Sequence, residues 1–217
     1  MGVVGGVVPR LRAASAAVAR RRHALRRRLA GLGRDALVAV VLPAGAVGPA
    51  LLAVYLPAGP LFVVGAALEA SAVVGFALAY GWLFYRSDRR RIGFYPVGLG
   101  MLAGVAAVML GLHMATAGLD PAVARAHARL NLLGFLGLTV VGVTYQFYPP
   151  AVGEFRGASD RTALAVAGLI ALGVTVEVVG HLVDLAALVT AGRTLALVGA
   201  AGYARLLVGL LRRLRNR

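Results

Sequence analysis

Long apolar stretches alternate along this chain with short segments that hold most of its charged residues. Each apolar stretch is about 20 residues long, the length that a helix needs to cross a bilayer. We expect six transmembrane helices, near residues 36–55, 61–85, 92–113, 127–150, 162–185 and 188–211. In the third, Gly100 and Gly104 have the spacing of a small-residue packing motif. The predicted fold class is an all-α, multi-pass membrane helix bundle.

The fourth stretch, residues 127–150, carries polar groups on one side of an otherwise apolar helix. Asp120 and Pro121 precede it and suit a helix start. Positions that recur at steps of three or four share one helix face. Here they are His127, Asn131, Gly134, Leu138, Gly142 and Tyr145. A face with an imidazole, an amide and two glycines gains nothing from contact with lipid, so we expect it to point into the bundle.

Composition excludes a soluble single domain. Of the 217 residues, 60% are hydrophobic and only 14% are charged, and the mean hydropathy is +0.83. Apolar runs as long as these would not fit in the core of one soluble domain of this size. The chain has no cysteine, which excludes a disulfide framework, a thiolate metal site and a thiol nucleophile.

The positive charge is concentrated at one side of the predicted bundle. All 23 basic residues are arginine, and the net charge is +15. With the N-terminus inside, nineteen arginines fall on the inner side and three on the outer side. The positive-inside rule explains this asymmetry better than binding to nucleic acid does. We therefore expect a basic cytoplasmic segment (residues 1–34), a transmembrane domain (35–211) and a basic cytoplasmic tail (212–217).

The predicted location is the plasma membrane of a prokaryote, with the lipid bilayer as the main partner. Six arginines between residues 20 and 28 suit a short helix that lies on an anionic leaflet. An arginine-rich start without acidic residues is also typical of an organellar transit peptide, so that alternative stays open.

Ionisable residues within the spans gather in the half of the bundle that this topology places outside. His113, His127 and His181 lie near the outer ends of spans three, four and five. Glu69 and Glu177 share that half, and Glu177 is on the same helix face as His181, four residues earlier. Such residues are costly in a bilayer, so each should have a partner or a task.

The imidazole side chains of these three histidines could serve several purposes. An imidazole ligates haem iron through one nitrogen while a second-shell acceptor orients the other. Three histidines at one depth would also suit copper or zinc. An interhelical hydrogen bond is the simplest alternative for each histidine. The outer arginines are suitable partners for haem propionates, although anchors at the membrane rim need no such role.

One segment of the chain resembles a known family. The run H-A-x-L-N-L-L-G-F from His127, followed by Gly142, Tyr145 and Pro149, is similar to the histidine-bearing helix of haem–copper oxidase subunit I. It is closest to the short membrane proteins described as cbb3-type subunit I-like. The likeness covers only residues 127–150. Those short relatives commonly read H-A-H-L and Y-H, whereas this chain has Arg129 and Gln146.

The resemblance implies that His127 is an axial ligand of haem b, and it makes His181 or His113 the expected second ligand. Asn131 and Arg129 would then line the cofactor site. A complete terminal oxidase needs more histidines and more helices than this chain offers, so whether the chain is an enzyme stays open. The implied role is electron transfer, or haem-linked sensing or assembly, in respiration or denitrification. Partners would be respiratory-complex subunits or a second copy of the chain.

A different class of function competes with this one. The second-ranked interpretation is a non-catalytic membrane bundle, or a small transporter in which Glu69, Glu177 and the histidines form a proton or cation path. A haem protein should direct its histidines into one cavity that Gly134 and Gly142 help to clear. A transporter should instead show polar residues through both halves of the membrane, and this chain shows them mainly in one.

Overall fold

A computed structural model describes residues 39–55, 59, 61–88, 91–150 and 157–215. The predicted basic segment of residues 1–34 lies outside these residues. The chain forms two compact units, residues 1–43 and residues 44–217. Of the first unit, only the start of the helix Ala39–Tyr55 is described. The fold below is that of the second unit.

The described secondary structure of the second unit is helical. After the helix that ends at Tyr55, its elements are α2 (Phe62–Arg86), α3 (Phe94–Ala117), α4 (Pro121–Arg129), η2 (Leu130–Gly137), α5 (Leu138–Phe147), α6 (Asp160–Leu182) and α7 (Ala186–Arg215). The π-helix η2 joins α4 and α5 into one continuous rod, Pro121–Phe147. We call this segment the central rod.

Five helices are long and apolar enough to cross a membrane: α2, α3, the central rod, α6 and α7. They coincide with predicted spans two to six. The predicted first span forms the shorter helix Ala39–Tyr55. The all-α fold of long, apolar helices is therefore confirmed among the described residues. The total of six crossings and the cytoplasmic position of both termini stay predictions.

Side-chain caps fix where two of the helices begin. Asp120 accepts hydrogen bonds from the amides of Ala122 (2.7 Å) and Val123 (3.4 Å), and Pro121 occupies the first turn of α4. The predicted start at these residues is confirmed. Helix α6 begins slightly earlier than predicted because Ser159 caps it, accepting from the Thr162 amide at 3.1 Å.

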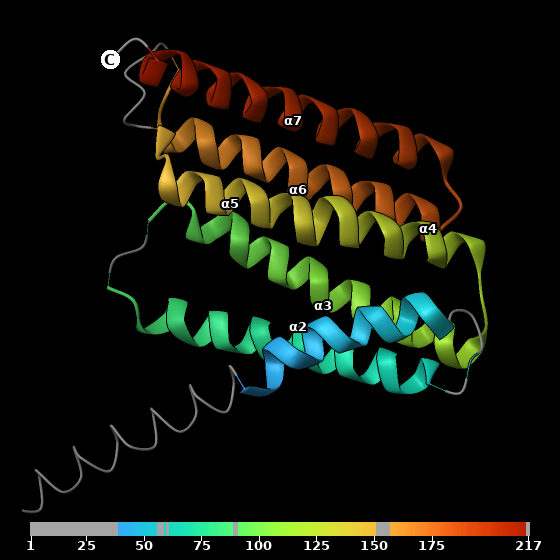
Figure 1. The fold of residues 1–217 in the computed structure, drawn as a ribbon. Coiled ribbons are helices and arrows are strands. Elements are labelled where there is room, and N and C mark those ends of the chain that lie inside the picture. Colours follow the sequence, from blue (N-terminus) through green and yellow to red (C-terminus); the bar gives the residue numbers. More distant parts are fainter. Residues whose placement is uncertain (1–38, 56–58, 60, 89–90, 151–156, 216–217) are drawn as a thin grey trace, which may run out of the picture. The chain divides into compact units, whose positions relative to one another are not determined.

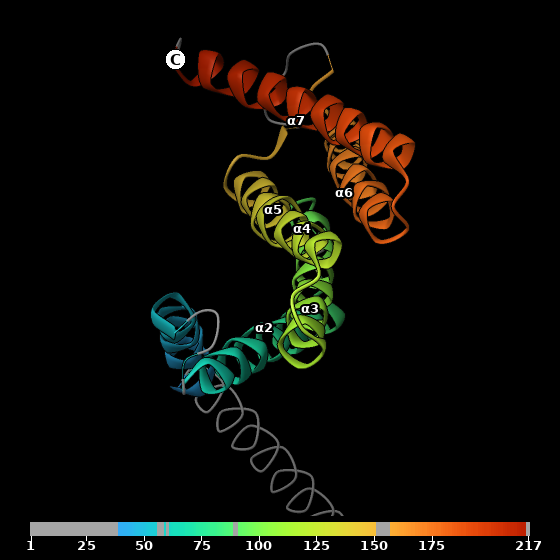
Figure 2. The same cartoon turned by 90° about the vertical axis from the view of Figure 1, so that its right-hand side faces the viewer.

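The helices pack mainly on their neighbours in the sequence (Figures 1 and 2). Helix α2 packs on α3, α3 on the central rod, the rod on α6, and α6 most extensively on α7. Half of the α6 span is buried, against 11% of the α2 span. The best-packed part of the molecule therefore lies around α6.

Glycines allow α3 and the central rod to approach closely. A Cβ atom on Gly142 would lie 2.6 Å from the Gly93 carbonyl oxygen, and one on Gly134 would lie 2.7 Å from Ala103 Cβ. On α3, a Cβ on Gly100 would lie 3.0 Å from the Phe135 carbonyl oxygen. The predicted inward orientation of this face and the packing role of Gly100 are confirmed. Since α3 fills the space beside these glycines, they serve helix packing here.

Candidate functional site

The most deeply buried charged group in the described chain is the carboxylate of Glu177 on α6, with 1% of its side chain exposed. Arg193 of α7 donates from Nε to Glu177 Oε1 at 2.8 Å. Arg129, the last residue of α4, places its Nε 2.9 Å from the same oxygen. His181 Nε2 lies 3.6 Å from it. We call these four residues the Glu177 cluster.

Close backbone packing brings the members of the cluster together. A Cβ atom on Gly192 would collide with the Glu177 backbone amide, and one on Gly180 would lie 2.6 Å from the Val189 amide. Glycine at both positions lets α7 lie directly on α6, so that Arg193, next to Gly192, reaches the carboxylate. Arg129 reaches it from the central rod, immediately before the π-helix begins. Wide π turns often occur at functional sites.

The cluster is not electrically balanced. One carboxylate faces two guanidiniums, which leaves one positive charge when His181 is neutral. A buried carboxylate without a partner would be very costly, and here both arginines compensate it. The arginine side chains are themselves 38% (Arg129) and 53% (Arg193) exposed. Both arginine side chains thus combine a bond to a buried carboxylate with partial exposure at the protein surface.

Two buried polar atoms of the cluster lack hydrogen-bond partners among the described residues. They are Glu177 Oε2 and His181 Nε2. Buried polar atoms are nearly always satisfied, and the exceptions are explained by local strain, by a bound water or ion, or by a redox or catalytic role. Thr139 Oγ1 and Tyr145 Oη, outside the cluster, also lack a partner among the described residues. Both atoms of the cluster belong to groups that gain and lose protons. This pair is therefore the strongest chemical signal in the described structure.

His127 occupies a separate site between the central rod and α3. Its Nδ1 lies 2.8 Å from the Ala107 carbonyl oxygen, so Nδ1 carries the proton and donates it. The other nitrogen, Nε2, then accepts from Asn131 Nδ2 at 3.0 Å. A Cβ atom on Gly111 would lie 3.1 Å from the His127 ring. Both ring nitrogens are satisfied, and the ring lies directly against the α3 backbone.

The three predicted histidines do not converge. His127 faces α3, whereas Arg129, about 200° further round α4, faces Glu177 and His181 on α6. His127 and His181 therefore lie on different sides of the central rod. His113 is exposed on α3. Within the described residues, no three histidine, aspartate or glutamate side chains are grouped as a metal ion would need.

The two predicted membrane acids also have different surroundings. Glu69 is half-buried on α2, and its backbone packs against Gly48 of the helix Ala39–Tyr55. Helix α2 packs on α3 rather than on α6. Glu69 thus lies away from Glu177, which alone of the two has ion-pair partners among the described residues.

The sequence pattern places Glu177 and His181 on one face, but it indicates the outer arginines as partners for haem propionates or as anchors at the membrane rim, and not as partners of Glu177. The depths of these side chains along their helices could have indicated the salt bridge from the sequence. At about 1.5 Å per residue, Arg193 lies roughly 10 Å from the start of α7 and Glu177 roughly 8 Å from the end of α6, so they reach one level. Two cations at the depth of a buried acid indicate a salt bridge.

Comparison of the chain with protein-family models, with curated proteins and with solved structures finds no match. What the Glu177 cluster can do follows from its own chemistry. A carboxylate and an imidazole exchange protons, and guanidiniums bind carboxylates and phosphates. Proton exchange and anion binding are thus the two kinds of chemistry that its side chains support.

Proposed function

We propose that this chain is a membrane protein that carries protons through the Glu177 cluster, as a proton conductor or a small proton-coupled transporter. The observation that carries the proposal is the pair of buried atoms without a hydrogen-bond partner among the described residues, Glu177 Oε2 and His181 Nε2. Chains of acidic and histidine side chains inside membrane spans are typical of proton relays. Neither atom has a structural hydrogen bond that would have to break when a proton arrives.

The arginines argue against a metal-cation site at Glu177. Arg129 and Arg193 already bind Glu177 Oε1, and their charges repel a sodium or calcium ion at that position. They also hold the carboxylate in one place beside the imidazole. A proton that enters is added at His181 Nε2 or Glu177 Oε2 and leaves from the same atom, so the net charge of the protein rises and falls by one.

Proton flux into vesicles tests the proposal. The protein is reconstituted into liposomes that contain a pH-sensitive dye, and a potassium diffusion potential drives protons inward. We expect wild-type vesicles to acidify faster than empty ones. Glu177→Gln and His181→Phe should both reduce the rate to that of empty vesicles, because each removes one of the two proton-accepting groups.

His113→Phe is the matched control, since it removes an exposed histidine near the same end of the bundle. It should leave the flux unchanged. Helical content measured by circular dichroism confirms that each variant is folded. The proposal is refuted if wild-type vesicles acidify no faster than empty ones, or if folded Glu177→Gln and His181→Phe variants keep the full rate.

A second function, haem b binding for electron transfer, has one specific observation in its favour. The bond from His127 Nδ1 to the Ala107 carbonyl fixes the tautomer that leaves the Nε2 lone pair for a ligand. The resemblance of residues 127–150 to a haem-binding helix supports the same residue. Iron ligation would require Asn131 to release Nε2. Bound haem would supply a one-electron carrier.

Visible spectra of the purified protein distinguish the two functions. A haem protein would show a reduced α band and a positive pyridine haemochrome test. His127→Ala should abolish the band, whereas Asn131→Ala should retain it, because that change frees the lone pair. Colourless protein from haem-replete cells would exclude the haem function and leave the proton proposal unaffected.

A further inference from the structure

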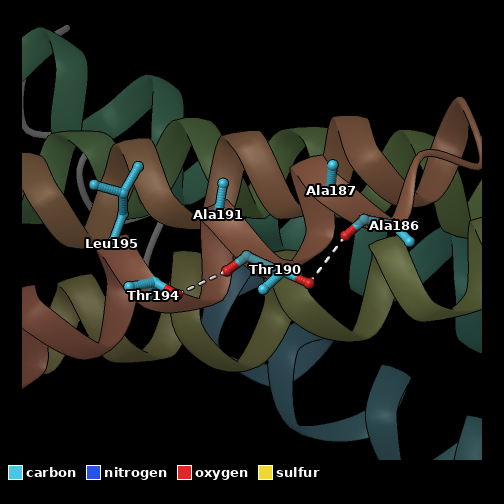
Figure 3. A pocket seen from close by; sticks show the side chains of 6 residues that line it. All are labelled: Ala186, Ala187, Thr190, Ala191, Thr194 and Leu195. Carbon is cyan, nitrogen blue, oxygen red and sulfur yellow. Dashed lines mark hydrogen bonds between the residues drawn. The ribbon is translucent and has the colours of Figure 1, made fainter.

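A shallow groove runs along the first turns of α7, on the side that faces away from α6 (Figure 3). Its volume is about 750 Å³. The lining residues are mostly small: Ala186, Ala187, Thr190, Ala191, Thr194 and Leu195. Gly192, in the same stretch, packs its backbone on α6 instead. The groove is therefore a surface of α7 that no described helix fills.

The groove is apolar despite its two threonines. Thr190 Oγ1 donates to the Ala186 carbonyl oxygen at 3.0 Å, and Thr194 Oγ1 donates to the Thr190 carbonyl oxygen at 3.0 Å. Figure 3 shows both bonds running back along the helix. The hydroxyl protons are thus used within α7. What remains in the groove is methyl and methylene surface, which suits a hydrocarbon chain.

A positive charge borders the groove. Along α7, Arg193 lies between Thr190 and Thr194. Successive residues of a helix are rotated by about 100°, which places Arg193 between the groove and the face of α7 that packs on α6. Because Arg193 and Arg129 bind one oxygen of Glu177 through Nε, their guanidiniums lie side by side. No partner for their terminal nitrogens occurs among the described residues. Together they carry one charge more than Glu177 neutralises.

We propose that this surface binds one anionic phospholipid. Its phosphate is held by the terminal nitrogens of Arg193 and Arg129, and one acyl chain lies in the α7 groove. Guanidiniums bind phosphate oxygens in a bidentate manner. Arg193 lies roughly 10 Å along the helix from Ala186, the first residue of α7. An arginine side chain that extends toward the membrane surface can reach the boundary between headgroups and hydrocarbon from there.

An anionic lipid explains both features at once. A hydrophobic partner helix would fill the groove but leave the surplus charge unpaired, and a free anion would pair with the charge but leave the groove empty. Lipid binding does not require proton transfer, so this proposal stands apart from the proposed function. His181→Phe, which should stop proton flux, should leave lipid binding unchanged.

Native mass spectrometry of the detergent-purified, full-length protein tests the proposal with phosphatidylglycerol and phosphatidylcholine as probes. We expect one phosphatidylglycerol to remain bound under conditions that remove phosphatidylcholine. Arg193→Gln should weaken its binding about fivefold, since one basic residue near a membrane surface contributes roughly that factor. Arg125→Gln is the matched control, because Arg125 is an exposed arginine on α4, and it should change nothing.

A second variant tests the groove without altering any charge. Ala191→Phe fills the groove on the exposed side of α7 and should also weaken phosphatidylglycerol binding, while helical content stays constant. Equal retention of both lipids overturns the proposal. So does an equal loss of binding in Arg125→Gln and Arg193→Gln. Inorganic phosphate that displaces the lipid completely at millimolar concentration would overturn the role of the groove.

Discussion

The shared oxygen of Glu177 predicts that its two arginines can replace each other. The carboxylate is 1% exposed and cannot reach water. Arg129 and Arg193 both bind it, and the side chain of each is partly exposed. Removing one arginine leaves the other in place, so Arg129→Ala and Arg193→Ala should each cost about 1 kcal/mol of unfolding free energy.

Removing both arginines leaves a buried carboxylate with no strong partner. The double variant should therefore lose about 3 to 5 kcal/mol, well above the sum of the single losses. The difference, about 1 to 3 kcal/mol, is the coupling energy of the two arginines through Glu177. Adding Glu177→Gln to the double variant should restore most of the loss, because the uncompensated charge is then gone.

Equilibrium unfolding in mixed micelles measures these values for the wild-type protein, both single variants, the double variant and the triple variant. Each unfolding free energy is taken from the same denaturant series. Single losses that add to the double loss within about 0.5 kcal/mol would refute the shared-carboxylate explanation. A triple variant no more stable than the double variant would refute it as well, since Glu177 would then not be the source of the cost.

Three further predictions concern a helix cap, a backbone contact and a hydrogen bond in the helices that carry the cluster. Each is measured by the same unfolding assay. Asp120→Ala removes the cap of α4 and should cost about 0.5 to 2 kcal/mol. Gly192→Leu should cost about 3 kcal/mol because its Cβ meets the α6 backbone, while Gly168→Leu, with open space around it, should cost almost nothing. Tyr203→Phe removes the hydroxyl bond from α7 to α5 and should cost about 0.6 kcal/mol.

Helix positions were predictable because the bilayer imposes a length and a composition on every span. The predicted spans two to six agree with the observed helices to within a few residues, apart from helix ends set by local caps such as Ser159. The inward face of the central rod was predictable for a related reason. Steps of three and four give the face directly, and glycines and amides in an apolar helix indicate which side meets protein.

The partners of each polar side chain were not predictable. Depth along a helix can be calculated from sequence, but rotation about the helix axis relative to a neighbour cannot. His113, His127 and His181 share a depth, yet they face different surroundings. The continuous rod through η2 and the glycine contacts that bring α7 against α6 decide these rotations. Both depend on the packing of one helix against another, which the periodicity within a single helix does not reveal.

Position 129 shows how one side chain changes what a helix can do. A histidine at this position would offer the lone pair of an imidazole nitrogen to a metal. An arginine stays protonated and has no lone pair to offer, so this position cannot ligate iron. In this chain it binds Glu177 at 2.9 Å. The central rod thus contributes a positive charge to the Glu177 cluster, and proton and anion chemistry fit that cluster better than metal binding does.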